Sequence, residues 1–301
     1  MTDLRLPAGR RSSTLRSDMM ARDRSKPFLA IAWPYMAYAA LIGLAFLTLI
    51  PIIWMVLTSF KSSPEVAASP PTWFPHSWHP ENYRDAWNAA PFGRYLANTV
   101  IVAGSVMILE TVTSALAAYA FARLRFPGRD IIFLTYLGTL MIPRQVTLIP
   151  QFILMRELGW IDTYQGLIIP QAFSAFGTFL LRQYFIGIPR ELEDAARIDG
   201  ASRWEIFRRI ILPLSGPALA TLAVFIFLYQ WNNLLWPLVM SNSESTRPVA
   251  VGLRAFQGQY ATDWNLLMAA AGLATLPVVA MYVVAQRWFV RGITLSGFGG
   301  R

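Results

Sequence analysis

Long uncharged stretches dominate the pattern of hydrophobic and polar positions along this chain. No residue between Lys26 and Lys61 is charged, and five later stretches carry at most one charge each. A helix needs about 20 apolar residues to cross the hydrocarbon core of a bilayer. The runs are continuous rather than alternating, which favours helices over the strands of a barrel. The pattern predicts an all-α integral membrane protein with six transmembrane helices, at residues 33–59, 95–121, 131–155, 163–182, 214–239 and 265–288.

Composition supports this prediction. Hydrophobic residues make up 55% of the chain and charged residues 14%, with a mean hydropathy of +0.41, whereas soluble domains carry about 25% charged residues. The absence of cysteine excludes disulfides and thiol catalysis. The first apolar run is too long for the core of a cleavable signal peptide, about 7–15 residues, so we interpret it as a membrane anchor.

The placement of lysine and arginine predicts the orientation. A net charge of +9 would suggest nucleic acid as the partner of a soluble protein. If the N-terminus is cytoplasmic, however, the inner segments hold 19 basic residues and the outer segments six. This is the positive-inside bias of a membrane protein, so a lipid surface explains the charge and nucleic acid is not needed. We expect both termini in the cytoplasm, with residues 1–27 as a polar tail.

The segment 189–213, between the fourth and fifth predicted spans, carries the densest local signals. Pro189 and three acidic residues suit the first turn of a helix, and Gly200 suits its end. Ser202 and Glu205 form an S-x-x-E capping box, which predicts a second helix. We therefore expect two short helices joined at Gly200. From these signals alone, the pair is either a docking surface or a simple link between spans.

A longer motif in this segment resembles a known family. Asp194-Ala195-Ala196 is followed by Gly200 and then by Ile210, Leu212 and Pro213. This is similar to the EAA motif of the permease subunits of bacterial ABC importers, except that Asp194 stands where the family usually has glutamate. The resemblance implies a coupling loop that docks on a cytoplasmic ATPase. The coupling residues it implies are Glu193, Asp194, Ala195, Ala196, Gly200, Ile210, Leu212 and Pro213.

Other motifs are similar to the carbohydrate-uptake branch of this family, across residues 90–301. They include 117–120 with Arg123 after it, 126–129 and Ile149-Pro150. The C-terminal residues 297–301 depart from the family pattern. The resemblance implies that residues 28–301 form a transmembrane permease domain in the bacterial cytoplasmic (inner) membrane. It would be half of a channel for a sugar, polyol or glycerol phosphate.

The resemblance also implies partners. These are a second homologous permease, two ATPase subunits and an extracytoplasmic binding protein. No cofactor is expected in this chain, because ATP and magnesium would bind to the ATPase. In agreement, the sequence has no G-x-x-x-x-G-K-[ST] phosphate loop.

Rival classes lack sequence support. An intramembrane enzyme would need convergent acid, base or nucleophilic groups, and the spans hold almost none. A secondary transporter has no need of an ATPase-docking loop, and no inverted repeat is evident. The two histidines, His76 and His79, are too few for a metal site, so none is predicted.

Two charges, Glu110 and Arg144, fall inside predicted spans. Each would cost about 2.5–3.5 kcal/mol if it faced lipid. We expect them to pair as an intramembrane ion pair, because one pair neutralises both charges. The alternative is a gate or a contact with the solute.

The fifth predicted span offers a candidate substrate path. Tyr229, Asn232, Asn233 and Trp236 share one face of a continuous helix. Aromatic rings beside amides suit sugars. The same face would equally suit a contact between helices in which amides pair across spans.

Overall fold

The computed structural model describes residues 27–258 and 262–296, so the predicted tail 1–27, apart from Pro27, and the C-terminal residues 297–301 lie outside the described residues. The described part is helical, with one isolated antiparallel bridge between Gln257 and Thr262. The chain divides into two units, residues 1–55 and 56–301. The first unit contains most of α2, Pro27–Ser59.

Three helices are long and apolar enough to cross a membrane. They are α2, α5 (Phe92–Arg123) and α16 (Trp264–Ser296). They correspond to the first, second and sixth predicted spans. Two bent helix pairs also pass the same test of length and apolarity.

The third, fourth and fifth predicted spans are broken, where the sequence predicted continuous helices. Residues 131–155 divide into α6 (Arg129–Gly138) with the 3₁₀ turn η1 (Thr139–Met141), and α7 (Arg144–Glu157), at a bend of 100°. Pro143 explains this break, because the residue before a proline is pushed out of the helical region. Ile142 is indeed extended.

The fourth predicted span consists of α8 (Tyr164–Ile168), the 3₁₀ turn η2 (Ile169–Gln171) and α9 (Ala175–Ile186). Ser174 caps α9 by accepting a hydrogen bond from the Gly177 amide at 3.1 Å. The fifth consists of α13 (Gly216–Trp231) and α14 (Leu235–Met240). Its break falls at Asn232, whose side chain donates to the Leu228 carbonyl at 2.9 Å. An asparagine side chain that binds a backbone carbonyl competes with the backbone hydrogen bonds of the helix. Pro237 has no amide hydrogen, so it cannot donate a hydrogen bond to a carbonyl in the break.

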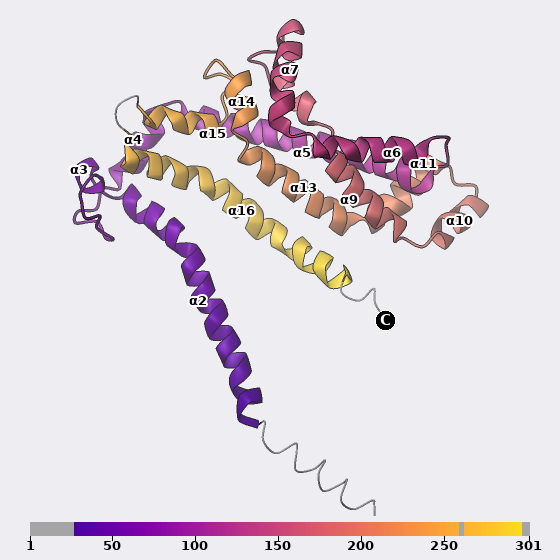
Figure 1. The fold of residues 1–301 in the computed structure, drawn as a ribbon, viewed down its shortest axis with the longest axis horizontal. Coiled ribbons are helices and arrows are strands. Elements are labelled where there is room, and N and C mark those ends of the chain that lie inside the picture. Colours follow the sequence, from indigo (N-terminus) through magenta and orange to yellow (C-terminus); the bar gives the residue numbers. More distant parts are fainter. Residues whose placement is uncertain (1–26, 259–261, 297–301) are drawn as a thin grey trace, which may run out of the picture. The chain divides into compact units, whose positions relative to one another are not determined.

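The second unit is built around α5, which packs against α9 and α13 (Figure 1). Small residues allow a close approach, since a Cβ on Gly177 of α9 would lie 2.5 Å from Ser114 Oγ of α5. α16 packs on α13 and on α4 (Glu81–Asn88), while α7 projects away from the bundle (Figure 1).

Shorter elements complete the unit. They are α3 (Ser63–Val66), α10 (Glu191–Ile198), α11 (Arg203–Ile206), the π-helix η3 (Phe207–Ile211), α12 (Leu212–Leu214), α15 (Val249–Gly252) and the 3₁₀ turn η4 (Leu253–Phe256). The larger hydrophobic cluster joins α5, α9 and α13 to the segment 189–213. That segment therefore rests on the core of the bundle.

Candidate functional site

The segment 189–213 has the helix ends that the sequence predicts. α10 ends beside Gly200, which has a φ of +83°, a conformation that favours glycine. Ser202 then caps α11 with both bonds of a capping box, and its amide donates to Glu205 Oε2 at 3.0 Å. That backbone bond leads the interactions that lower the pKa of Glu205. The corner between α10 and α11 is therefore fixed by the conformation of Gly200 and by the hydrogen bonds of the capping box.

One long-range ion pair joins this segment to the bundle. Arg123, at the end of α5, lies 2.7 Å from Glu193 of α10, and each side chain is only 3% exposed. Arg123 Nη2 also donates to the carbonyls of Phe185 and Ile188, each at 2.6 Å. Glu193 therefore points into the protein and secures α10 at the end of α5.

The neighbouring residues of α10 point outward. Asp194 is exposed and pairs with the exposed Arg197 at 3.0 Å. Ala195 is exposed and Ala196 is half-buried against the core. Ile198, at the end of α10, is 87% exposed. The helix thus combines an internal charge with a small, partly apolar outer surface.

In the second half of the segment, the residues of the sequence motif are not the most deeply buried ones. Ile210 and Leu212 are half-buried and Pro213 is exposed. The residues that enter the core are Ile206, Phe207 and Ile211. The Tyr119 ring packs at a tilt against Phe207, with the ring centres 4.9 Å apart, and its hydroxyl donates to the Arg203 carbonyl at 3.1 Å.

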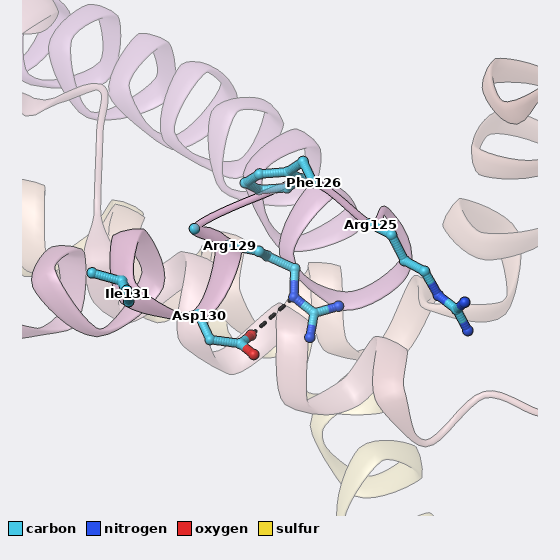
Figure 2. A pocket seen from close by; sticks show the side chains of 6 residues that line it. Arg125, Phe126, Arg129, Asp130 and Ile131 are labelled. Carbon is cyan, nitrogen blue, oxygen red and sulfur yellow. Dashed lines mark hydrogen bonds and ion pairs between the residues drawn. The ribbon is translucent and has the colours of Figure 1, made fainter.

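The turn after α5 adds basic side chains at this end of the bundle. Figure 2 shows a hollow lined by Arg125, Phe126, Gly128, Arg129, Asp130 and Ile131. Arg129 pairs with Asp130 at 2.9 Å, and Gly128 has a φ of +76°. This hollow is open, with no buried charge at its base among the six lining residues.

The expected Glu110–Arg144 ion pair is wrong. No ion pair joins these two described residues. The break at Pro143 puts Arg144 at the start of α7, where its Nη1 donates to Gln171 Oε1 at 3.0 Å and to the Tyr229 hydroxyl at 3.1 Å. Glu110 is 8% exposed. It interacts with Ser174 and, at longer range than an ion pair, with the charge of Arg144.

The four residues of the candidate substrate path do not share one helix face. The break after Trp231 separates Tyr229 from Trp236, which is buried and donates from Nε1 to the Gly166 carbonyl at 3.1 Å. Asn232 bonds its own backbone, and Asn233 donates to Gln230 Oε1 at 3.1 Å. Tyr229 and Asn233 instead belong to the polar cluster around Arg144.

A second polar centre, around Asp162, was not predicted. Its carboxylate accepts from the amides of Asn242 and Ser243, both at 3.0 Å, and from Thr246 Oγ1 at 2.5 Å. Partial burial opposes the charge, but these bonds lower the pKa of Asp162 to about 2. They hold the segment 241–246 against the start of α8. The sequence separation explains why no local motif indicated this contact.

Comparison with known proteins identifies the family and the fold. Residues 111–295 match the family described as the binding-protein-dependent transport system inner membrane component. The chain belongs to this family. It is a permease and not an enzyme, as the sequence predicted, and the family places it in the inner membrane as a multi-pass protein.

Relatives of the permease agree. It is 34% identical over 273 residues to the arabinooligosaccharides transport system permease AraQ of Halalkalibacterium halodurans, covering 89% of this chain and 98% of the relative. It is 39% identical to the sn-glycerol-3-phosphate transport system permease UgpE of Rhizobium meliloti, covering 81% and 89%. A bacterial ABC transporter chain involved in import of the acidic polysaccharide alginate matches with a TM-score of 0.76, 26% identity and coverage of 89% and 98%. The predicted resemblance is confirmed.

The matched range of the permease contains the segment 189–213 and the cluster around Arg144. Sequence reasoning missed the partner of Glu193, although it noted Arg123 as part of a family motif. An arginine at the last position of an apolar helix was the available signal. Its partner lies 70 residues further along the chain, so spacing could not reveal the pair.

Proposed function

We propose that the permease forms half of the membrane channel of an ABC importer. The other half is a second homologous permease, two ATPase subunits bind the cytoplasmic side, and an extracytoplasmic binding protein delivers the solute. The solute class is a sugar, a related polyol or a glycerol phosphate. The names of the relatives support this class, and a structure of the same fold is described in complex with a periplasmic protein that holds an alginate pentasaccharide.

We also propose six spans with both termini in the cytoplasm. The three long helices and the bent pair of α6–η1 with α7 supply four, α8 with η2 and α9 would supply the fifth, and α13 with α14 the sixth. The excess of 19 basic residues over six supports the orientation. Because the chain has no cysteine, single cysteines at the exposed positions 77 and 200 test it directly. An impermeant thiol reagent added to intact cells should label position 77, and labelling at position 200 would contradict the orientation.

The coupling role is supported by the two faces of α10, one of which is anchored in the protein while the other is exposed. Glu193 is buried against Arg123, while Asp194, Ala195 and Ile198 are exposed. A mobile linker would need no buried charge pair at its base. An isoleucine left 87% exposed on an anchored helix suits a docking contact with another protein.

The experiment compares charge reversals at two ends of the second unit. Asp194→Lys should reduce recovery of the ATPase with the purified permease, solute uptake and binding-protein-stimulated ATP hydrolysis together. Asp85→Lys is the matched control, because Asp85 of α4 is also exposed and makes only a weak surface pair with Arg84 at 3.6 Å. If Asp194→Lys and Ile198→Asp both keep full stimulated hydrolysis, α10 is only a link between spans.

A further inference from the structure

Three broken helices bring polar side chains to one place in the second unit. Arg144 begins α7 directly after one break, and Gln171 ends η2 directly before another. Tyr229 and Gln230 lie in the last turn of α13, and Asn233 lies in the break that follows. Hydrogen bonds link these residues in sequence, with Gln230 Nε2 3.5 Å from Gln171 Oε1 and Asn233 Nδ2 3.1 Å from Gln230 Oε1. We call these five residues the break cluster.

The break cluster lies deep along the bundle. Glu110 is 18 residues after the start of α5 and 13 before its end, which is about 27 and 20 Å along a helix. Thr113, one turn from Glu110, donates to the Ala172 carbonyl at 2.6 Å, and Ala172 adjoins Gln171. In the six-span arrangement proposed above, this level falls within the hydrocarbon core and away from lipid headgroups.

The partners of Arg144 are neutral. Nη1 donates to an amide oxygen and to a phenol oxygen, and the guanidinium carbon lies 4.9 Å from the centre of the Tyr229 ring. Within the described part of the chain, Nε and Nη2 of Arg144 have no hydrogen-bond acceptor and no carboxylate pairs with the group. Arg144 is exposed, and Tyr229 is 50% exposed.

This geometry presents an anchored guanidinium with no carboxylate in direct contact, because Glu110 acts on it only at longer range than an ion pair. An intramembrane arginine is costly in lipid and normally faces water or an opposite charge. The Nε–Nη2 edge of arginine matches the two oxygens of a carboxylate or phosphate. The tyrosine ring and the amides beside it suit the carbon skeleton and hydroxyls of a polyol.

We propose that Arg144 is a solute-contact residue that binds the anionic group, a carboxylate or phosphate, of the solute that this permease transports. The proposal rests on the importer function proposed above and narrows its solute class to acidic sugars or phosphorylated polyols. Gln171 and Tyr229 position the guanidinium, and Asn233 lines the approach to it.

The first test is transport by the complete reconstituted importer. The probes are sn-glycerol 3-phosphate and a uronic-acid disaccharide, with glycerol and maltose as neutral counterparts, each first checked for binding to the cognate binding protein. Arg144→Gln should lower uptake of the accepted anionic probe about 10- to 100-fold, the value of a lost charge-assisted hydrogen bond or two. Arg144→Lys should recover part of the lost uptake, because the positive charge remains but the two-pronged geometry of the guanidinium is lost. Arg156→Gln, elsewhere on α7 and exposed beside Glu157, should leave uptake unchanged.

The second test needs no solute. A single cysteine replacing Asn233 is labelled in the assembled importer with an anionic or a cationic methanethiosulfonate. The anionic reagent should react several-fold faster than the cationic one, and Arg144→Gln should abolish this preference. No preference would mean that a carboxylate, either Glu110 or one of another subunit, neutralises Arg144, which overturns the proposal.

The two proposals fail in different ways. If the importer accepts only the neutral probes while the binding protein still stimulates ATP hydrolysis, the anion site is wrong and the importer function stands. If the binding protein stimulates no hydrolysis with the unaltered permease, the importer function itself fails. Recovery of Arg144→Gln with its partner subunits separates loss of transport from loss of assembly.

Discussion

Arg123 and Arg144 are held in opposite ways. Arg123 is 3% exposed, faces a carboxylate and donates to two backbone carbonyls. Arg144 is exposed, contacts only neutral side chains and leaves one edge open. A buried guanidinium must be neutralised where it lies, so Arg123 is part of the framework. A guanidinium that is oriented but has no carboxylate in direct contact is free to bind a mobile anion.

The largest expected effect comes from breaking the buried pair. Arg123→Ala or Glu193→Ala leaves a charge unpaired in the core, which should destabilise the permease by about 3–5 kcal/mol. Replacing both with Arg123→Met and Glu193→Leu should recover most of that loss. Thermal unfolding of the purified importer measures it. Arg209→Ala is the control, because the Arg209 side chain is 76% exposed and pairs on the surface with Glu205 at 3.6 Å. A double variant as unstable as the singles would mean that the two residues act separately.

The same pair shows what sequence could and could not predict. Pro189, Gly200 and the Ser202–Glu205 box act within a few residues, so the helix ends of the segment 189–213 were predictable. Glu193 was predicted as a coupling residue, but its inward orientation depends on Arg123 of a distant helix. Long-range pairing leaves no periodic trace in one sequence.

The spans show the same limit. α2, α5 and α16 were predicted because a long apolar run has one regular solution in lipid, and the prolines inside α2 and α16 do not interrupt these helices. The breaks at Pro143 and Asn232 were missed because hydropathy averages over such residues. The predicted Glu110–Arg144 pair and the shared face of Tyr229 and Trp236 both assumed continuous helices. They were wrong for this reason, and the break cluster lies where that assumption failed.

The corner at Gly200 should give the next largest effect. Gly200→Val places a β-branched residue at a φ of +83°, which costs about 1–2 kcal/mol or more. A Cβ there meets no atom within 4 Å, so the strain is purely conformational. Binding-protein-stimulated ATP hydrolysis should fall while the permease still assembles with its membrane partner. Gly200→Asn, which tolerates this conformation, should keep most of the activity, and equal losses in both variants would exclude the conformational explanation.

Asp162 offers a carboxylate counterpart to Arg144, since it too is held by neutral groups. Its pKa is lowered from 3.8 to about 2, so its contribution to stability is present above about pH 4 and is lost as the pH falls through about 2. Asp162→Asn should lower the unfolding temperature at pH 6, and this difference from the unaltered permease should shrink towards pH 2. Differential scanning fluorimetry at several pH values measures it. A difference that stays constant with pH would show that the charge of Asp162 does not hold the segment 241–246.

The smallest expected effect separates orientation from charge at Arg144. Tyr229→Phe removes the hydroxyl that accepts from Arg144 Nη1 but keeps the ring 4.9 Å from the guanidinium carbon. Gln171 still accepts from the same nitrogen, so the arginine should keep its charge and lose only part of its alignment. A hydrogen bond of this kind contributes about 0.5–1.5 kcal/mol, which corresponds to roughly a two- to tenfold rise in the KM for an anionic probe. The Nη2 hydrogen bonds of the buried Arg123 go to backbone carbonyls, which a side-chain substitution cannot remove, so only the exposed arginine allows such a graded test. Uptake kinetics over a range of solute concentrations measure the change, with Tyr282→Phe on the exposed surface of α16 as the control. An unchanged KM beside a large loss in Arg144→Gln would mean that Tyr229 does not position the guanidinium.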